Sequence, residues 1–233
     1  MTAPASHEPY EAELARGLAL AAALSAYPDD ATLSLLDGLP LGSFPCASGF
    51  ADALAADGGG AAVRAAYIDL FDRGKGGASP YETEHGRMRG MSKGNDLADL
   101  SGFYRAFGLE LDPERAHEPH DHVAVELEFY TVLLLKQAHL ERLGDQEGCD
   151  VVRAARQKFL STHLAPLALG LAGRPAVRDS ALYGPLFAWC GEVLAAECER
   201  LGVRPVPLDY FDDPEAASEL SCATGTHLPV IPS

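Results

Sequence analysis

Large apolar residues recur at helical spacing along most of the chain. Leu14, Leu18 and Ala21 stand at positions i, i+4 and i+7, which places them on one face of a helix. Proline and glycine residues interrupt this pattern at intervals and mark helix ends and turns. The pattern predicts helices over residues 8–25, 31–36, 48–56, 61–72, 95–107, 121–143, 145–163, 166–171 and 180–201.

The predicted helix over residues 121–143 is apolar nearly all round. Residues such as Val125 and Leu127 fall on different sides of it, as expected of a helix at the centre of a core. No segment alternates apolar and polar residues as a half-buried strand does, and no repeat of fixed period occurs. The sequence therefore predicts an all-α fold. We expect a single helical domain over residues 1–233, with a Pro/Asp-rich C-terminal tail from about residue 205.

A glycine-rich segment over residues 73–95 separates two of the predicted helices. A loop of roughly 20 residues inside a compact domain is uncommon and is often functional. Within it, Ser79-Pro80-Tyr81-Glu82 offers an aromatic ring, a rigid turn and a carboxylate together. That combination suits the binding of a peptide with an apolar part and a basic part.

The chain is strongly acidic. Its 233 residues hold 18 Lys and Arg against 34 Asp and Glu, a formal net charge of −16. Such a surface repels nucleic-acid backbones and anionic membranes, which argues against both as partners. The charge favours a cationic partner such as a basic peptide, or it serves solubility alone. The hydrophobic content of 47% argues against a largely disordered chain.

Three features predict a cytoplasmic protein. The longest apolar run near the start, over residues 18–26, is shorter than the ~20 residues that span a bilayer. The first residues, MTAPASHEPYEAE, are acidic and lack the basic region of a secretory signal. The five cysteines are odd in number, lie far apart and form no CxxC pair, which is typical of reduced thiols.

The densest polar cluster is His117–His122, with three imidazoles and two carboxylates. These are ligand types for a divalent metal, and a metal site is one interpretation. The other is a helix start, in which Pro119 restricts the entry and Asp121 caps free N–H groups at the positive end of the helix dipole. Adjacent ligands in a loop point in different directions, which favours the helix start.

Glu126 follows His122 by one helical turn, and Glu128 lies close by. A histidine and a carboxylate at i and i+4 can pair and, in an acid–base enzyme, can move a proton. The alternative, which we favour, is a carboxylate that is exposed or partly buried without a catalytic role. The chain contains no P-loop motif, no GxSxG elbow and no HExxH motif.

Several segments, taken together in their order and spacing, resemble the TorD/DmsD/NarJ family of redox-enzyme maturation chaperones. They span about residues 60–170. The segments are Tyr67-x-x-Leu70-Phe71, Ser79-Pro80-Tyr81-Glu82, Leu97 to Leu109, Glu118-Pro119-x-Asp121-His122 with the following Val123-Ala124-x-Glu126-Leu127-x-Phe129, and Phe159-Leu160-x-x-His163-Leu164. By spacing alone, the first of these segments is a core face. The segments Tyr81–His85 and Leu97–Leu109 look most like the subgroup that serves type II enzymes of the dimethyl sulfoxide reductase family.

The resemblance implies a cytoplasmic, all-helical chaperone that is not an enzyme. Members of the family bind the apo catalytic subunit of a molybdoenzyme, often through its twin-arginine signal peptide. They hold that subunit until the molybdenum cofactor is inserted and keep it from premature export. The resemblance implies no resident cofactor, and guanine-nucleotide binding has been proposed for some members.

Matching positions imply a peptide-binding site. Leu70 and Phe71, with Tyr67, would line or support an apolar groove, which Pro80 and Tyr81 would border. Its polar edge would be formed by Asp121 and His122 and by the neighbouring residues Glu82, Glu118, Pro119 and Glu126. Carboxylates beside an apolar groove suit a signal peptide, because arginine and carboxylate form charge-assisted pairs. Some family members have tryptophan where this chain has Tyr81, and the only tryptophan here is Trp189.

Two other functions remain as alternatives. One is a metal-dependent hydrolase that uses the cluster His117–His122. The other is a helical scaffold that binds a different partner.

Overall fold

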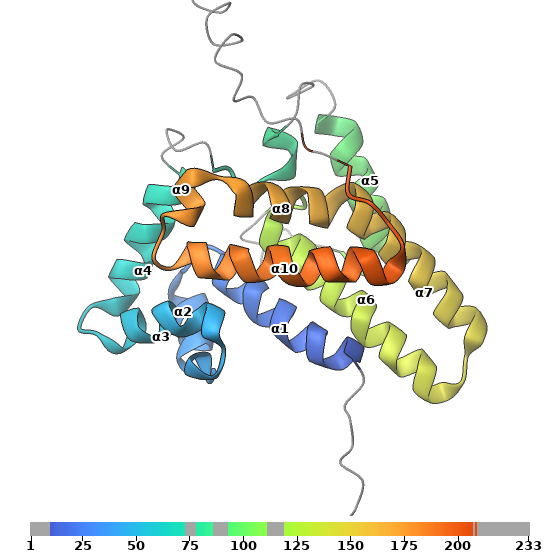
Figure 1. Ribbon diagram of the computed structural model, residues 1–233, viewed down its shortest axis with the longest axis horizontal. Helices are drawn as coiled ribbons and strands as arrows, with labels where there is room; N and C mark the ends of the chain where they lie inside the picture. Colours follow the sequence, from blue (N-terminus) through green and yellow to red (C-terminus); the bar gives the residue numbers. More distant parts are fainter. Residues whose placement is uncertain (1–9, 73–77, 86–92, 111–118, 207, 209–233) are drawn as a thin grey trace, which may run out of the picture.

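The computed structural model describes residues 10–72, 78–85, 93–110, 119–206 and 208 (Figure 1). These residues form helices and no strand, so the predicted all-α class is confirmed; their only β-type pairing is an isolated bridge between Tyr81 and His122. The helices are α1 (Tyr10–Ser25), α2 (Asp30–Asp37), α3 (Ser48–Ala55), α4 (Gly59–Tyr67), α5 (Lys93–Ala106), α6 (Val123–Leu143), α7 (Gln146–Phe159), α8 (Ala165–Gly173), α9 (Pro175–Arg178) and α10 (Tyr183–Leu201).

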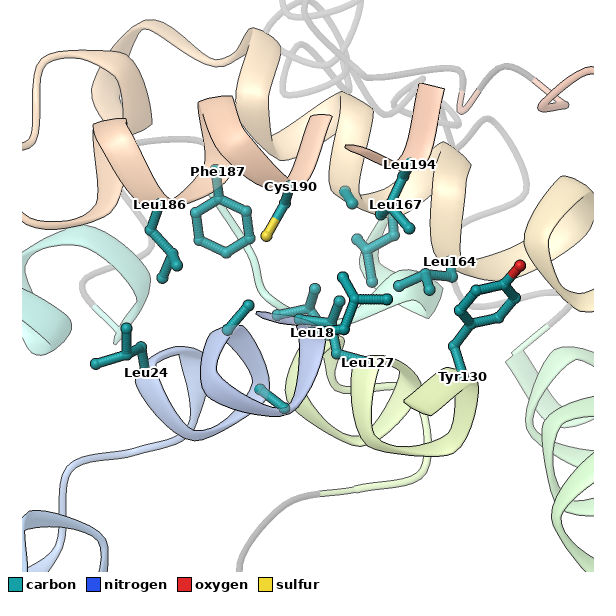
Figure 2. Packing of buried hydrophobic residues seen from close by; sticks show 14 of the residues in the cluster. Leu18, Leu24, Leu127, Tyr130, Leu164, Leu167, Leu186, Phe187, Cys190 and Leu194 are labelled. Carbon is teal, nitrogen blue, oxygen red and sulfur yellow. The ribbon is translucent and has the colours of Figure 1, made fainter. Parts of the chain in front are cut away.

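The core lies between two layers of helices. Helix α1 packs along α6, and α8 packs along α10. Figure 2 shows Leu18 and Leu127 of the first layer facing Phe187 and Cys190 of the second. All four side chains are fully buried. The predicted apolar face of α1 is confirmed, because Leu14, Leu18 and Ala21 are all buried.

Helix α6 is the longest helix among the described residues and contacts both α1 and α7. Its inward residues include Leu127, Tyr130 and Leu133, none of which has exposed surface. The prediction of a helix surrounded by the core is correct for these positions. It is wrong for Leu135, whose side chain is 51% exposed. One side of α6 therefore faces solvent.

A close approach of backbone and ring joins α1 to α10. A Cβ atom added to Gly17 would lie 2.7 Å from Cη2 of Trp189. Any larger residue at position 17 would force the indole aside, because carbon atoms do not pack at that distance. Glycine is therefore required where these two helices cross.

A buried network of charged and polar groups links four helices. Glu197 of α10 accepts hydrogen bonds from Arg156 of α7, from Tyr130 of α6 and from Arg200. Glu11 of α1 lies 3.2 Å from the guanidinium of Arg200 and 3.7 Å from that of Arg156. Arg156 and Glu197 are almost completely buried. Burial favours the neutral carboxyl, but hydrogen bonds from Arg200, Tyr130 and Arg156 prevail and lower the pKa of Glu197.

Several helix boundaries differ from the prediction. Helix α5 begins at Lys93, so Asn95 and Asp96 lie inside it and do not cap it. The predicted helix over 145–163 ends at Phe159 and continues as a π-helical segment, Leu160–Leu164. A second π-helical segment, Ile68–Asp72, follows α4. Wider turns of this kind insert one residue into a helix and change which side chains face inward.

Other expectations concern the cysteines, the membrane and the C-terminal tail. The four cysteines in the described part of the chain are free thiols. No helix in that part is long and apolar enough to cross a membrane. After α10, the amide of Val206 donates a hydrogen bond to the carbonyl of Ser161. The predicted tail beyond this point lies largely outside the described residues.

Candidate functional site

Two of the motif segments are paired through their backbones. The amide of Glu82 donates to the carbonyl of Asp121 at 2.8 Å, and the amide of Val123 donates to the carbonyl of Pro80 at 2.9 Å. The Tyr81–His122 bridge lies between these bonds. Residues 78–85 and 119–123 therefore form one fixed unit at the start of α6, as a shared site requires.

Asp121 secures this unit. Its Oδ2 accepts a hydrogen bond from the Thr83 hydroxyl at 2.5 Å and one from the Thr83 amide at 3.3 Å. Both side chains are buried. The prediction that Asp121 caps the following helix is wrong, because the capping side chain is that of His122. Asp121 instead holds the loop residue Thr83.

His122 connects α6 with the π-helical region after α4. Its Nδ1 accepts a hydrogen bond from the Ala124 amide at 3.1 Å, and its Nε2 lies 3.1 Å from the Tyr67 hydroxyl. The imidazole is fully buried, and burial lowers the pKa of His122 to about 3. The ring is therefore neutral at physiological pH. Because Nδ1 accepts, the proton resides on Nε2, which donates to Tyr67.

Tyr67, Leu70 and Phe71 belong to the core. The ring centroids of Tyr67 and Phe71 are 4.9 Å apart, and Phe71 lies 5.0 Å from Tyr183 of α10. All three predicted groove residues are less than a tenth exposed. They lie in the core next to the unit formed by residues 78–85 and 119–123, which contacts them through His122 and Tyr67. They do not provide an open surface in this structure.

A buried histidine that was not among the predicted site residues pairs with Glu82. His163 Nδ1 lies 3.0 Å from Glu82 Oε2, and His163 Nε2 lies 3.1 Å from Asp99 Oδ2. Burial disfavours the imidazolium, but the hydrogen bonds and charges of Glu82 and Asp99 prevail and raise the pKa of His163. Burial also raises the pKa of Glu82, with nearby Asp96 and Asp121 adding to the rise. The pKa values of Glu82 and of His163 are thus both raised in the folded protein.

Glu126 is the least expected member of the site. Its side chain is fully buried, and neither carboxyl oxygen has a hydrogen-bond partner among the described residues. Burial, together with the charges of Glu82 and Asp121, raises the pKa of Glu126 well above its ordinary value. The expectation that we favoured, an exposed or partly buried carboxylate, is therefore wrong. The alternative, an i, i+4 pair with His122, does not form either, because both nitrogens of His122 have other partners.

The predicted site residues thus fall into three groups. Glu82, Asp121, His122 and Glu126 are buried together around the start of α6, above the core residues Tyr67, Leu70 and Phe71. Pro80 is buried, Tyr81 is half-buried and Pro119 is exposed. Glu118 lies outside the described residues. Their role in client binding stays a prediction.

Sequence reasoning missed Thr83, Asp99, Tyr104 and His163. Tyr104 donates a hydrogen bond from its hydroxyl to the His120 carbonyl at 2.7 Å. His163 appeared only as part of a segment resembling the family, and Asp99 and Tyr104 only within the segment Leu97–Leu109. No local pattern indicates that Thr83 meets Asp121 or that Tyr104 meets His120. The contacts of His163 with Glu82 and Asp99 are equally hidden, because these residues lie far apart in the chain.

The described part of the cluster His117–His122 has ordinary structural partners. His120 Nδ1 lies 3.2 Å from the Ser101 hydroxyl, and His122 is engaged as described above. Within the described residues, no three histidine, cysteine or acidic side chains are arranged to hold a metal ion. His117 itself lies outside those residues.

Comparison with known proteins identifies the family. A family model described as nitrate reductase delta subunit matches residues 46–169, a range that contains both paired segments and His163. The chain belongs to the TorD/DmsD/NarJ family of redox-enzyme maturation chaperones. A chlorate reductase assembly chaperone protein of Ideonella dechloratans is 33% identical to this chaperone over 147 residues, which cover 61% of this chain and 72% of that protein.

Membership decides between the chaperone and the enzyme considered from the sequence. Chaperones of this family are maturation factors for molybdoenzymes and do not catalyse a reaction. This chaperone is therefore an assembly factor and not an enzyme, and the interpretation as a metal-dependent hydrolase is wrong.

Proposed function

We propose that this chaperone binds the apo catalytic subunit of a molybdoenzyme in the cytoplasm and holds it until the molybdenum cofactor has been inserted. Where the client carries a twin-arginine leader, the chaperone binds that leader and delays export. The client belongs to the type II enzymes of the dimethyl sulfoxide reductase family. The similarity to a chlorate reductase assembly chaperone supports this class of client.

The observation that carries the proposal is the buried acidic group at the start of α6. Glu82, Asp121 and Glu126 interact electrostatically there, and Glu126 has no hydrogen-bond partner among the described residues. A buried carboxyl without a partner destabilises a fold, so folding alone does not account for it. A cationic partner such as the arginines of a leader is favoured here, because a nearby positive charge stabilises the ionised form of these carboxyls.

The parts of the site that reach solvent are few. Tyr81 and Pro119 lie on the paired segments whose backbones are fixed by the bonds at Glu82 and Val123. A fixed surface lowers the entropy lost on binding a peptide. We therefore assign the direct contacts to Tyr81 and Pro119, and the electrostatic attraction to the carboxylates beneath them.

The test is a calorimetric titration of the full chaperone with a synthetic twin-arginine leader peptide and its twin-lysine counterpart. We expect the arginine peptide to bind and the lysine peptide to bind more weakly, since guanidinium pairs with carboxylate in two places at once. Tyr81→Ala should weaken binding. Leu35→Ala, which truncates an exposed side chain of α2 away from the paired segments, is the control.

Co-purification from the native host tests the client itself. A molybdoenzyme catalytic subunit in the eluate supports the proposal. Recovery of a different partner, together with no binding of either peptide, would favour the helical scaffold and contradict the chaperone role proposed here. The proposal requires no resident cofactor, and titrations with GDP and GTP under the same conditions test the nucleotide binding that the family resemblance raises.

A further inference from the structure

Two adjoining hollows lie between the end of α5 and the first half of α6. The larger, about 210 Å³, has walls formed by Leu109, Val125, Phe129 and Val132. The other, about 180 Å³, is more polar and includes Ser101, Arg105 and His120. The two share Tyr104, Leu109 and Glu110, so they form one continuous groove. Leu109 and Phe129 belong to segments that resemble the family, whereas Val132 lies outside those segments.

The apolar wall of the groove extends along α6. Val125, Phe129 and Val132 stand at positions i, i+4 and i+7, which places them on one face of the helix. Leu135 continues this stripe one turn further and is 51% exposed. We name Val125, Phe129, Val132 and Leu135 the α6 stripe. A stripe of this length on a helix suits an apolar segment laid along it.

The rim of the larger hollow is acidic. Glu110 and Glu128 line it and are exposed, and its lining contains no basic residue. Two basic residues close to the groove do not line the larger hollow. Arg105 lines the more polar hollow, and the ammonium of Lys136 lies 5.7 Å from the ring centroid of Phe107. An apolar floor with two carboxylates at its rim is complementary to an apolar segment that carries a basic residue.

One residue of the groove also interacts electrostatically with the buried carboxylates. Tyr104 is buried at the junction of the two hollows. Its own burial, and then the charges of Glu126, Glu82 and Asp121, raise the pKa of Tyr104 above its ordinary value. Tyr104 therefore lines the groove and interacts electrostatically with the buried acidic group. This links the unexplained burial of Glu126 to a surface that a partner can reach.

We propose that this groove binds an apolar segment of the client, with a basic side chain of that segment between Glu110 and Glu128. The inference rests on the proposed function and assigns the client contact to residues that were not among the predicted site residues. A second copy of the chain fits less well, because two chains that each carry a net charge of −16 repel each other.

Charge reversal at the rim tests the electrostatic part. Glu128→Arg replaces an attraction with a repulsion, and we expect the affinity for the twin-arginine leader peptide to fall by about tenfold. Glu192→Arg makes the same change of charge at an exposed position of α10 and should leave the affinity within about twofold. Because both positions are exposed, both variants should fold.

A pair of isosteric substitutions tests the apolar part. Val132→Thr places a hydroxyl in the α6 stripe without changing the volume, and we expect binding to weaken by about fivefold. Val151→Thr makes the same substitution at a position of α7 that is 60% exposed and should have no effect. Circular dichroism of all four variants checks that the helical content is unchanged.

The outcomes separate the inference from the function on which it rests. Normal binding by Glu128→Arg and Val132→Thr, with binding by the unaltered chain intact, would overturn the groove and leave the chaperone role standing. If the unaltered chain binds neither peptide nor client subunit, the groove inference and the proposed function are both contradicted. Sedimentation equilibrium adds a third arm. A dimer that Glu128→Arg dissociates would show that a second copy occupies the groove, which also overturns the inference.

Discussion

His163 Nδ1 lies 3.0 Å from Glu82 Oε2, although the two residues are 81 positions apart in the chain. Glu82 belongs to the segment that pairs with residues 119–123, and His163 belongs to the π-helical segment between α7 and α8. The contact therefore joins the candidate site to the second layer of helices. Because Asp99 faces the other ring nitrogen, the imidazole holds α5 in the same place.

Replacing His163 with asparagine should destabilise the protein by about 1–2 kcal/mol at pH 6. Although burial opposes it, pairing with Glu82 and Asp99 raises the pKa of His163. The stabilisation is therefore complete below the unfolded value of about 6.5 and is lost as the pH rises through the higher folded value. Thermal unfolding at pH 6 and pH 9 should show a smaller deficit at pH 9. His139→Asn, at an exposed position of α6, is the control, and equal deficits at both pH values would contradict a charged imidazole.

Glu126→Gln should stabilise the protein at pH 8. Burial raises the pKa of Glu126 well above its ordinary value, so its favourable state is protonated. The associated stability is full below the unfolded value of about 4.3 and is lost as the pH rises through the folded value. The neutral amide avoids this loss, and we expect a gain of about 1–3 kcal/mol.

The gain from Glu126→Gln should shrink toward zero near pH 4.5, which unfolding curves at both pH values would show. Glu192→Gln serves as the control, because it makes the same substitution at an exposed position of α10. A loss of stability at pH 8 would mean that the Glu126 carboxylate is paired in the folded protein.

Tyr67→Phe should cost about 1 kcal/mol. The substitution keeps the ring packing against Phe71 but removes the oxygen that accepts from His122 Nε2, which is then left buried without that partner. Tyr183→Phe is the matched comparison, because the Tyr183 hydroxyl is buried and has no hydrogen-bond partner among the described residues. Urea unfolding should show a loss for position 67 and none for position 183. Equal losses would contradict the bond to His122.

Glu197→Gln should destabilise the protein by roughly 3 kcal/mol at pH 7, because it leaves the Arg156 charge buried and poorly compensated. Although burial opposes ionisation, hydrogen bonds from Arg200, Tyr130 and Arg156 lower the pKa of Glu197. The stability it contributes is present above the unfolded value of about 4.3 and is lost as the pH falls through the lower folded value. Unfolding at pH 7 and pH 3.5 should show the smaller deficit at pH 3.5.

The double variant Glu197→Met with Arg156→Met is the control for that network. Removing both charges together should recover most of the loss, because hydrophobic residues of similar volume often replace a buried ion pair without cost. If the double variant is less stable than Glu197→Gln, an uncompensated buried charge does not account for the loss of stability, and the ion pair itself stabilises the fold.

Helix boundaries show where prediction from local pattern ended. The apolar spacing in α1 predicted both the helix and its buried face, because periodicity depends only on residues a turn apart. The start of α5 at Lys93 and the π-helical segment after Phe159 were not predicted. Neither follows from local spacing, and the π-helical segment begins where Phe159 packs against Phe103 of α5.

The candidate site divides in the same way. Its residue types could be read from the motifs, since a carboxylate and an aromatic ring beside a proline are local features. The motifs do not indicate which of these residues are exposed. The pairing of residues 78–85 with 119–123, and the contact of Glu82 with His163, join segments that only the folded chain brings together.

The order and spacing of residues along the chain were enough for the helical class, the long apolar helix and the family. Tertiary packing decided that His122 and not Asp121 caps α6, that Glu126 is buried without a partner among the described residues, and that an acidic groove opens beside Tyr104. The physical reason is that helix formation follows interactions within a few residues. Burial, pKa and the shape of a groove are set by side chains that are distant in sequence.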